Sequence, residues 1–126
     1  ADKTALEAIL HPRIRAELEA RTAAAAGKIA IASIPLLAEG GGREAYPWLD
    51  PILVIDVTPA TQRARLVARD RIDGALADRM IAAQASRADR LAIADDILRN
   101  EGTLDALRRR VADLLRLYRR LATEAA

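Results

Sequence analysis

Two short apolar runs, set between segments with helical spacing, constrain the fold of this chain more than any other feature. The runs are residues 28–34, rich in Ile and Ala, and residues 52–57, rich in Ile, Val and Leu. A short continuous apolar run is typical of a strand buried on both faces. A briefer run at Ile97 and Leu98 predicts a third strand. Because these strands alternate with helices, we expect a parallel three-layer α/β sheet.

The segment before the first run has the pattern of a helix. In residues 6–18, apolar side chains recur three and four positions apart. We expect Asp2 to cap this helix, Pro12 to kink it or to start a new helix, and Gly27 to end it. Residues 36–51, with three glycines and two prolines, predict a long loop or a broken helix.

Further helices are predicted after the second run. Thr58-Pro59 is a good helix start, and the pattern that follows extends to about Asp70. Asp73 is expected to cap a helix with three residues facing inward, namely Leu76, Met80 and Ile81. A second short helix holds Arg87, Arg90, Leu91 and Ile93. Thr103 is expected to cap the last helix, whose apolar stripe is Leu104, Leu107, Val111, Leu114, Leu115, Tyr118 and Leu121.

The composition excludes several classes of protein. Of 126 residues, 52% are hydrophobic and 30% are charged, so we expect residues 1–126 to form a single globular domain. A net charge of only +2 and an aromatic content of 2% argue against binding nucleic acid. No apolar run reaches membrane-spanning length, which argues against a membrane partner. The absence of cysteine fits a cytoplasmic protein, and with a single His we expect no metal site.

Arg87 and Arg90 are the strongest candidates for binding a ligand. They lie three residues apart on a predicted helix and can therefore reach the same target. The planar guanidinium group suits phosphate, which it binds at two oxygens at once. Arginine also dominates the 20 basic residues, since the only lysines are Lys3 and Lys28. By spacing alone, a solvated helix face without a ligand explains the pair as well.

Four motifs follow one another along the chain. Residues 6–14 read L-E-A-I-L-H-P-R-I, and residues 34–39 read I-P-L-L-A-E. Residues 54–62 read V-I-D-V-T-P-A-T-Q, and residues 84–102 read Q-A-S-R-A-D-R-L-A-I-A-D-D-I-L-R-N-E-G. Together they resemble the dephospho-CoA kinase family, whose members carry a similar Leu-rich helix with His-Pro, a Pro-Leu-Leu loop, a strand with a helix start, and a Q-x-x-R-x-x-R-L-x-x-A-D-D run.

The resemblance implies a fold and a reaction. The fold is a P-loop kinase-like parallel sheet with a helical lid excursion at about residues 70–94. The reaction is ATP-dependent phosphorylation of the ribose 3′-hydroxyl of dephospho-CoA, the last step of coenzyme A biosynthesis, with ATP and Mg²⁺. The family's glycine-rich loop with Gly-Lys-Ser or Gly-Lys-Thr is absent, because Gly40-Gly41-Gly42 is followed by Arg43. We therefore expect this chain to be the C-terminal part of a longer kinase, inactive alone, with most magnesium ligands elsewhere.

The resemblance also implies roles for single residues. Arg87 corresponds to a lid arginine that closes on the transferring phosphate, and Arg90 is a second phosphate-binding candidate. Asn100 and Gly102 match the loop beside the adenine of ATP. The residues expected at the dephospho-CoA pocket are His11, Pro35, Leu36, Leu37 and Glu39. Asp95 and Asp96 are expected to be structural partners rather than metal ligands.

Two alternatives remain open at this point. The first is another P-loop kinase of the nucleoside monophosphate type, which shares the fold and an arginine lid. The second is an Arg-rich helical binding module for nucleic acid or a partner helix, led by residues 108–110 and by Arg119 and Arg120. The apolar stripe of the last helix argues against the second, because a helix that packs on a core needs such a stripe.

Overall fold

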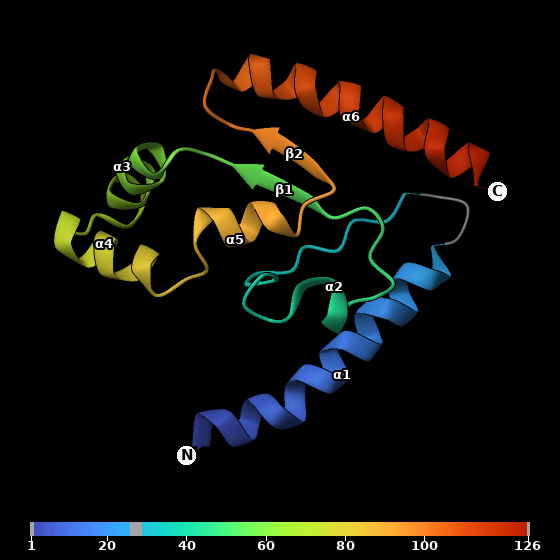
Figure 1. The fold of residues 1–126 in the computed structure, drawn as a ribbon, viewed down its shortest axis with the longest axis horizontal. Helices are drawn as coiled ribbons and strands as arrows, with labels where there is room; N and C mark the ends of the chain where they lie inside the picture. The colour runs from blue at the N-terminus through green and yellow to red at the C-terminus, as the bar shows by residue number, and fades with distance from the viewer. Residues whose placement is uncertain (1, 26–28, 126) are drawn as a thin grey trace. The chain divides into compact units, whose positions relative to one another are not determined.

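The computed structural model describes residues 2–25 and 29–125, which fall into two compact units. One unit comprises Ala1–Ile34 together with Leu114–Ala126, and the other comprises Pro35–Asp113. In chain order the helices and strands are α1 Asp2–Ala24, α2 Gly42–Ala45, β1 Leu53–Asp56, α3 Pro59–Asp70, α4 Gly74–Ala82, α5 Arg87–Ala92, β2 Asp96–Arg99 and α6 Leu104–Glu124 (Figure 1).

In the first unit, α1 is an uninterrupted helix. Pro12 lies inside it, so the predicted new helix at Pro12 is wrong. Strong helix formers on both sides of Pro12, such as Ala, Leu, Glu and Arg, extend the helix through it. Asp2 is already in the first turn, so its predicted role as a preceding cap is also wrong. An ion pair between Arg21 and Glu17, with an N–O distance of 2.7 Å, supports the last turns.

Residues 29–34 form no strand, so the strand predicted at residues 28–34 is wrong for this part of the run. Lys28, and Gly27 as the predicted end of the first helix, lie outside the described residues. Ile31 is 89% exposed. A strand needs a neighbour for its backbone N–H and C=O groups, and no described segment pairs with residues 29–34. An apolar run alone is therefore not sufficient for a strand.

In the second unit, β1 and β2 form a parallel two-stranded sheet. Leu53 pairs with Asp96, and the register continues to Asp56 opposite Arg99. The strands predicted at residues 52–57 and at Ile97 and Leu98 are thereby confirmed, as is an α/β fold with a parallel sheet. Both strands end at the same edge of the sheet, because parallel strands run in one direction (Figure 1).

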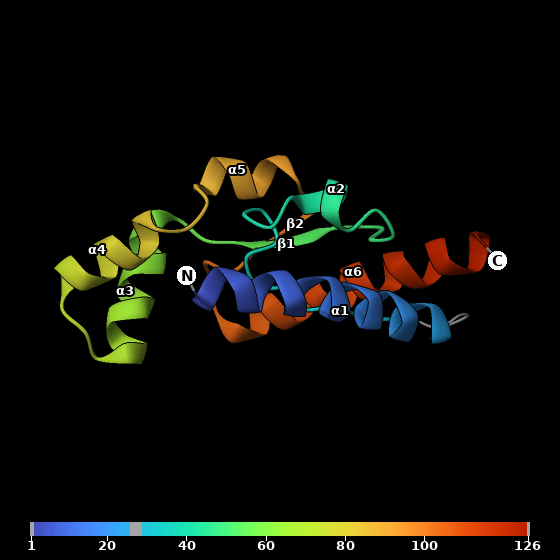
Figure 2. The same cartoon turned by 90° about the horizontal axis from the view of Figure 1, so that it is seen from below.

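The strands are less buried than the apolar runs predicted. Figure 2 shows α5 and α2 on one side of the sheet, and α5 contacts β1 there. On β1, Leu53 and Ile55 are 37% and 54% exposed, whereas Asp56 is buried. Burial on both faces needs a layer packed over each face, and the exposure of Leu53 and Ile55 shows that β1 does not reach it. The buried apolar residues are Tyr46, Ile52, Ala77 and Leu98.

The helices between the strands begin where local sequence signals predicted. Thr58 caps α3 by accepting a hydrogen bond from the Thr61 N–H, and Asp73 caps α4 by accepting one from the Leu76 N–H. Pro59 occupies the first turn of α3, where its missing N–H has no cost. The inward orientation predicted for Met80 is wrong, because Met80 is exposed and Ala77 is the residue that α4 buries.

The segment before the sheet is a loop around a short helix, as predicted for residues 36–51. Gly41 and Gly42 have φ values of 97° and 52°, which a residue with a side chain rarely adopts. A Cβ atom added to Gly42 would lie 3.2 Å from Cγ2 of Ile93. These glycines let the loop turn tightly against the end of α5.

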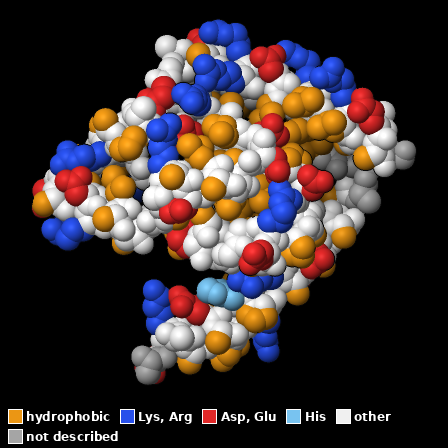
Figure 3. Space-filling view, viewed as in Figure 1, with side chains coloured by type: hydrophobic (Ala, Val, Ile, Leu, Met, Phe, Trp, Pro, Cys, Tyr) orange, Lys and Arg blue, Asp and Glu red, His pale blue; other side chains and the backbone are white. Residues whose placement is uncertain are grey.

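The last helix, α6, begins as predicted, because the Thr103 hydroxyl accepts a hydrogen bond of 3.2 Å from the Ala106 N–H. Its apolar stripe is only partly covered, since Leu104, Val111 and Leu121 are exposed. Basic side chains line α6 in the space-filling view (Figure 3). None of the helices in the described part of the chain combines the length and the apolar character that a membrane span requires.

Candidate functional site

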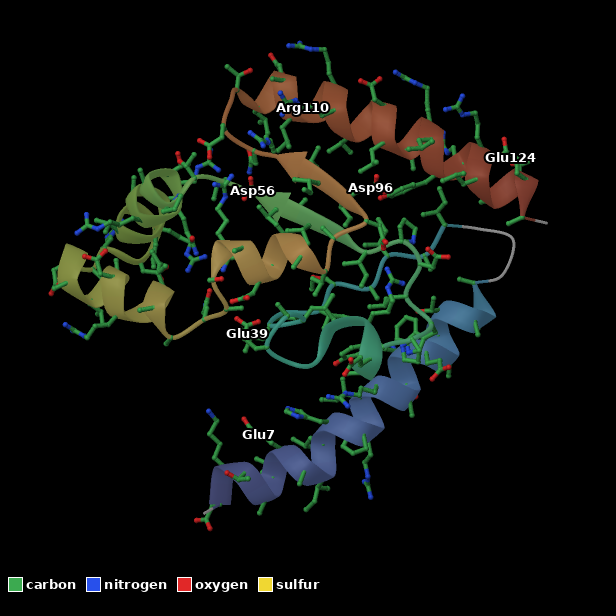
Figure 4. All side chains as sticks on the ribbon, in the orientation of Figure 1. Glu7, Glu39, Asp56, Asp96, Arg110 and Glu124 are labelled. Carbon is green, nitrogen blue, oxygen red and sulfur yellow. The ribbon has the colours of Figure 1, made fainter. Side chains whose placement is uncertain are left out.

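The candidate site is built around Asp56, the last residue of β1. Asp56 is 5% exposed, and its carboxylate accepts two hydrogen bonds from Arg87, the first residue of α5. The Arg87 Nε atom lies 2.8 Å from Oδ1, and Nη2 lies 2.7 Å from Oδ2. Figure 4 shows Asp56 at the carboxyl end of the strand. Ligands of open α/β sheets bind at this edge, so the pair lies where a site is expected.

Both members of the pair are charged at neutral pH. The hydrogen bonds from Arg87 lower the pKa of Asp56, and they outweigh the opposing effect of burial. The positive charges of Arg99 and Arg90 lower it further. The same hydrogen bonds raise the pKa of Arg87. The guanidinium side chain keeps 35% of its surface exposed, so a cation stays accessible beside a buried anion.

The segment after β2 lies at the same edge of the sheet. The backbone N–H of Asn100 donates a hydrogen bond of 2.9 Å to the backbone oxygen of Asp56. Glu101 accepts hydrogen bonds from the Thr58 N–H and from the Thr61 hydroxyl, the latter at 2.7 Å. These hydrogen bonds, that of the Thr58 N–H first, lower the pKa of Glu101. The loop that follows β2 is thereby attached to the start of α3 and to the end of β1.

Gly102 lies in this loop without a packing reason for glycine. A Cβ atom added there would lie 3.6 Å from the Cβ of Ala106, an ordinary contact distance. Its φ is not among the positive values that only glycine adopts readily. A side chain the size of Ala would therefore fit at Gly102 in ordinary contact with Ala106.

A capping box fixes the start of α5 and with it the position of Arg87. The Ser86 hydroxyl accepts a hydrogen bond of 3.1 Å from the Asp89 N–H, and the Asp89 carboxylate accepts one of 3.2 Å from the Ser86 N–H. Such reciprocal bonds satisfy two donors that a helix start otherwise leaves without partners. The backbone at Arg87 is thus fixed by the reciprocal hydrogen bonds between Ser86 and Asp89, which lie on either side of it.

Arg90 and Glu39 hold the connection between α4 and α5. Arg90 Nη1 donates a hydrogen bond of 2.6 Å to the backbone oxygen of Ala85, and the Glu39 carboxylate accepts one of 2.5 Å from the Ala85 N–H. Glu39 belongs to the loop before α2 and reaches this connection in Figure 4. Arg90 therefore binds a backbone oxygen, while its positive charge also acts on Asp56, the partner of Arg87.

The other residues of the expected acceptor pocket lie in two places. Pro35, Leu36 and Leu37 open the second unit, and Leu36 is exposed with a φ of 57°. The backbone oxygens of Leu36 and Leu37 accept hydrogen bonds of 2.8 and 2.9 Å from the N–H groups of Gly40 and Gly42. His11 is an exposed residue of α1 in the first unit. The turn of residues 35–42 thus presents apolar side chains at the surface.

Possible metal ligands among the described residues do not cluster. Among them, no three His, Asp or Glu side chains lie close enough together to hold a metal. Asp95 is a structural partner, because its carboxylate binds Arg43 and accepts a hydrogen bond of 2.7 Å from the Ile52 N–H. The bond from Ile52 contributes most to the lowered pKa of Asp95. Asp96 opens β2.

The sequence alone did not identify Asp56, Arg43 or Glu101 as site residues. Asp56 carried a usable signal, because a single acid inside an apolar strand run must find a partner when it is buried. The partner could not be named, since Arg87 is 31 residues away in the chain. Arg43 and Glu101 carried no signal beyond that of ordinary charged loop residues.

Comparison with known proteins gives the family. The family model for dephospho-CoA kinase (CoaE) matches residues 1–106. The chain belongs to the dephospho-CoA kinase family. The resemblance drawn from the four motifs is thereby confirmed.

Relatives within the dephospho-CoA kinase family are close in sequence. The dephospho-CoA kinase of Xanthomonas campestris pv. campestris strain 8004 is 57% identical over 118 residues, which are 94% of this chain and 57% of the relative. That of Xylella fastidiosa strain Temecula1 is 54% identical over 123 residues, 98% of this chain and 59% of the relative. The chain therefore spans less than two thirds of the length of the curated dephospho-CoA kinases that it matches.

Proposed function

We propose that the protein with this chain transfers the γ-phosphoryl group of ATP to the ribose 3′-hydroxyl of dephospho-CoA, the last step of coenzyme A biosynthesis. One structural observation supports the proposal in addition to family membership. A partly exposed arginine, Arg87, is held by a buried carboxylate at the carboxyl end of a parallel strand. Phosphoryl transfer depends on positioned positive charge at this kind of edge rather than on covalent chemistry.

Arg87 is proposed to bind the transferring phosphoryl group. Its bonds to Asp56 use Nε and one side of Nη2, and no other hydrogen-bond partner of Arg87 occurs among the described residues. The guanidinium has more N–H donors than one carboxylate accepts, so Nη1 can still donate to phosphate oxygens. Its charge is retained because the hydrogen bonds from Arg87 to Asp56 raise its pKa. Arg90 is proposed as a supporting charge, since its side chain already binds the backbone of Ala85.

The loop after β2 is proposed to lie beside the adenine ring. The backbone bond between Asn100 and Asp56 supports this, because it joins the loop to the same edge as Arg87. A glycine permits the flat face of a base to approach the main chain closely.

The acceptor dephospho-CoA is proposed to bind along the turn of residues 35–42, and His11 of the first unit is proposed separately as a binding residue. The exposed side chain of Leu36 supports an organic ligand there. The Glu39 carboxylate ties this turn to the α4–α5 connection through Ala85. Contact of the acceptor with the turn could therefore influence the segment that carries Arg87.

We further propose that residues 70–94, which include α4 and α5, act as a lid, and that residues 1–126 serve as one functional module. ATP and dephospho-CoA are the proposed partners, without nucleic acid or membrane. Mg²⁺ would be held mainly by phosphate oxygens, water and groups other than the described residues. The absence of cysteine supports a cytoplasmic location.

An acceptor comparison tests this function. The intact protein is incubated with ATP, Mg²⁺ and either dephospho-CoA or AMP, and ADP release is followed by a coupled assay. We expect turnover with dephospho-CoA and none above background with AMP. Turnover with AMP alone would instead support a kinase of the nucleoside monophosphate type, and no turnover with either acceptor would overturn the proposal.

A further inference from the structure

The Asp56–Arg87 pair differs from the other ion pairs of the described chain in its burial. The side chain of Asp56 is 6% exposed, whereas the acids of the other pairs are between 30% and 75% exposed. Taking a carboxylate out of water is costly unless it is paired and hydrogen-bonded. The two hydrogen bonds from Arg87 supply that pairing. A buried anion therefore strongly constrains where the guanidinium can lie.

The geometry of the pair leaves one edge of the guanidinium available. Asp56 receives its bonds from Nε and Nη2, along the side of the fork. The opposite edge, formed by Nη1 and the second N–H of Nη2, can bind two oxygens of another anion. The guanidinium group is planar and rigid, so a carboxylate that fixes the Nε–Nη2 edge also fixes the direction in which the Nη1 edge points.

The backbone of Asp56 has a second connection. Its oxygen accepts the hydrogen bond from the Asn100 N–H at 2.9 Å. One residue thus contacts both the arginine and the loop that follows β2. The bond from Asn100 continues the parallel pairing of β1 with β2, whereas the bonds from Arg87 come from a side chain of α5.

We propose that Asp56 is a positioning residue for phosphoryl transfer, which holds the Arg87 guanidinium so that its Nη1 edge faces the phosphates of a nucleotide beside the Asn100 loop. The inference rests on the proposed function and deepens it. Asp56 touches no substrate in this proposal and acts through Arg87. The nucleotide is bound by the free edge of the arginine, and the carboxylate supplies its orientation.

Steady-state kinetics of the intact protein test the proposal. In Asp56→Asn the amide cannot accept both hydrogen bonds, and we expect kcat to fall about 10- to 100-fold with KM for both substrates within about threefold. Asp56→Glu keeps the charge and should recover part of kcat. Asp105→Asn is the control, because Asp105 forms an exposed pair with Arg108 on α6. It should leave kcat unchanged.

A double variant separates positioning from a structural role. In the Arg87→Ala background, Asp56→Asn should change kcat by less than about threefold, because the group through which Asp56 acts is already gone. An equally large loss in both backgrounds overturns the proposal. A kcat for Asp56→Asn within about threefold of that of the wild type also overturns the proposal. If Asp56→Asn does not fold, as judged by thermal unfolding, the same comparison uses Asp56→Glu.

A nuclear magnetic resonance titration distinguishes failure of this inference from failure of the proposed function. In ¹⁵N-arginine-labelled intact protein, ATP should shift the Arg87 Nη signals and leave its Nε–H signal in place. If dephospho-CoA is not phosphorylated but ATP still shifts the Nη signals, the proposed acceptor is wrong and the positioning by Asp56 stands. Movement of the Nε–H signal to that of an unbound arginine, or no shift of Nη, overturns the positioning whatever the acceptor.

Discussion

At the scale of single residues, the site depends on which charges are buried and which remain accessible. Asp56 is the buried charged residue of the described core, and Arg87 is its partner at the surface. Removing the arginine leaves a desolvated carboxylate without its hydrogen bonds, so the two residues cannot be varied independently. Arg43 and Asp95 form a comparable but more exposed contact near the start of β1.

Substitution of Arg87 is the first residue-scale prediction. In the intact protein, Arg87→Ala should lower kcat about 10³-fold, the lower end of the effect of arginines that stabilise a transferring phosphoryl group. KM for dephospho-CoA should change little, because the contribution is concentrated in the transition state. Arg87→Lys should recover activity only in part, since a point charge lacks the planar fork.

The control for Arg87 is Arg108 on α6, whose exposed pair with Asp105 lies outside the site. Arg108→Ala should leave both kinetic constants unchanged in the ADP-release assay. Equal loss of activity in the two alanine variants would contradict a specific role of Arg87. A loss that simply follows the unfolded fraction, measured by circular dichroism, would contradict it as well.

Sequence reasoning identified Arg87 but not the reason for its position. Spacing on a helix and arginine chemistry are local properties, and they singled out Arg87 and Arg90. In the structure the two residues have different hydrogen-bond partners, because Arg87 binds Asp56 whereas Arg90 binds the oxygen of Ala85. That outcome depends on the path of the α4–α5 connection. The pairing with Asp56 depends on the strand register, which no local pattern contains.

At the scale of elements, helix starts were well predicted and one strand was not. Thr58, Asp73 and Thr103 cap helices as predicted, because capping depends on a few neighbouring residues. A strand depends on a distant partner instead. The run at residues 28–34 had the right composition, but residues 29–34 pair with no described strand.

The capping box of α5 gives an element-scale prediction. Ser86→Ala removes the acceptor for the Asp89 N–H and should lower the free energy of unfolding by about 1 kcal/mol. Ser33→Ala is the matched control, because Ser33 is exposed and outside any helix, and it should change stability by less than about 0.5 kcal/mol. Urea denaturation followed by circular dichroism measures both. Equal midpoints for the two variants would show that the box does not stabilise α5.

The proposed lid gives a second element-scale prediction. In the protein without ligand, backbone amides of residues 70–94 should exchange hydrogen faster than those of β1 and β2. The reason is that α4 and α5 bury little apolar surface, with Ala77 as their one fully buried residue. Hydrogen exchange by mass spectrometry measures the difference, and ATP should reduce it. Protection equal to that of the strands without ligand would contradict a mobile lid.

At the scale of the whole molecule, the described chain consists of two compact units. Composition and periodicity predicted an α/β fold with a parallel sheet, and the second unit has one. The division into units was not predicted, because it depends on contacts between distant segments. The sequence also gave no measure of how much apolar surface the folded chain leaves exposed, since exposure of residues such as Ile31 and Ile55 depends on what covers them.

Acid stability is the molecule-scale prediction. Hydrogen bonds lower the pKa of five carboxyl groups, those of Asp56, Asp70, Asp78, Asp95 and Glu101. A lowered pKa in the folded state means that the stabilisation is complete above the unfolded value and is lost as the pH falls through the folded value. The urea midpoint should therefore be similar at pH 7 and pH 5 and fall below about pH 4. An unchanged midpoint at pH 3 would contradict these ion pairs.

The identity of the phosphorylated product tests the central claim most directly. The intact protein is incubated with ATP, Mg²⁺ and dephospho-CoA, and the product is examined by mass spectrometry and ³¹P nuclear magnetic resonance. The account predicts that dephospho-CoA gains one phosphate as a monoester on the ribose 3′-oxygen, with one ADP formed for each product. It also predicts that Arg87→Ala nearly abolishes formation of this product whereas Arg108→Ala does not. Phosphate at another position, or full product formation by Arg87→Ala, would contradict the account.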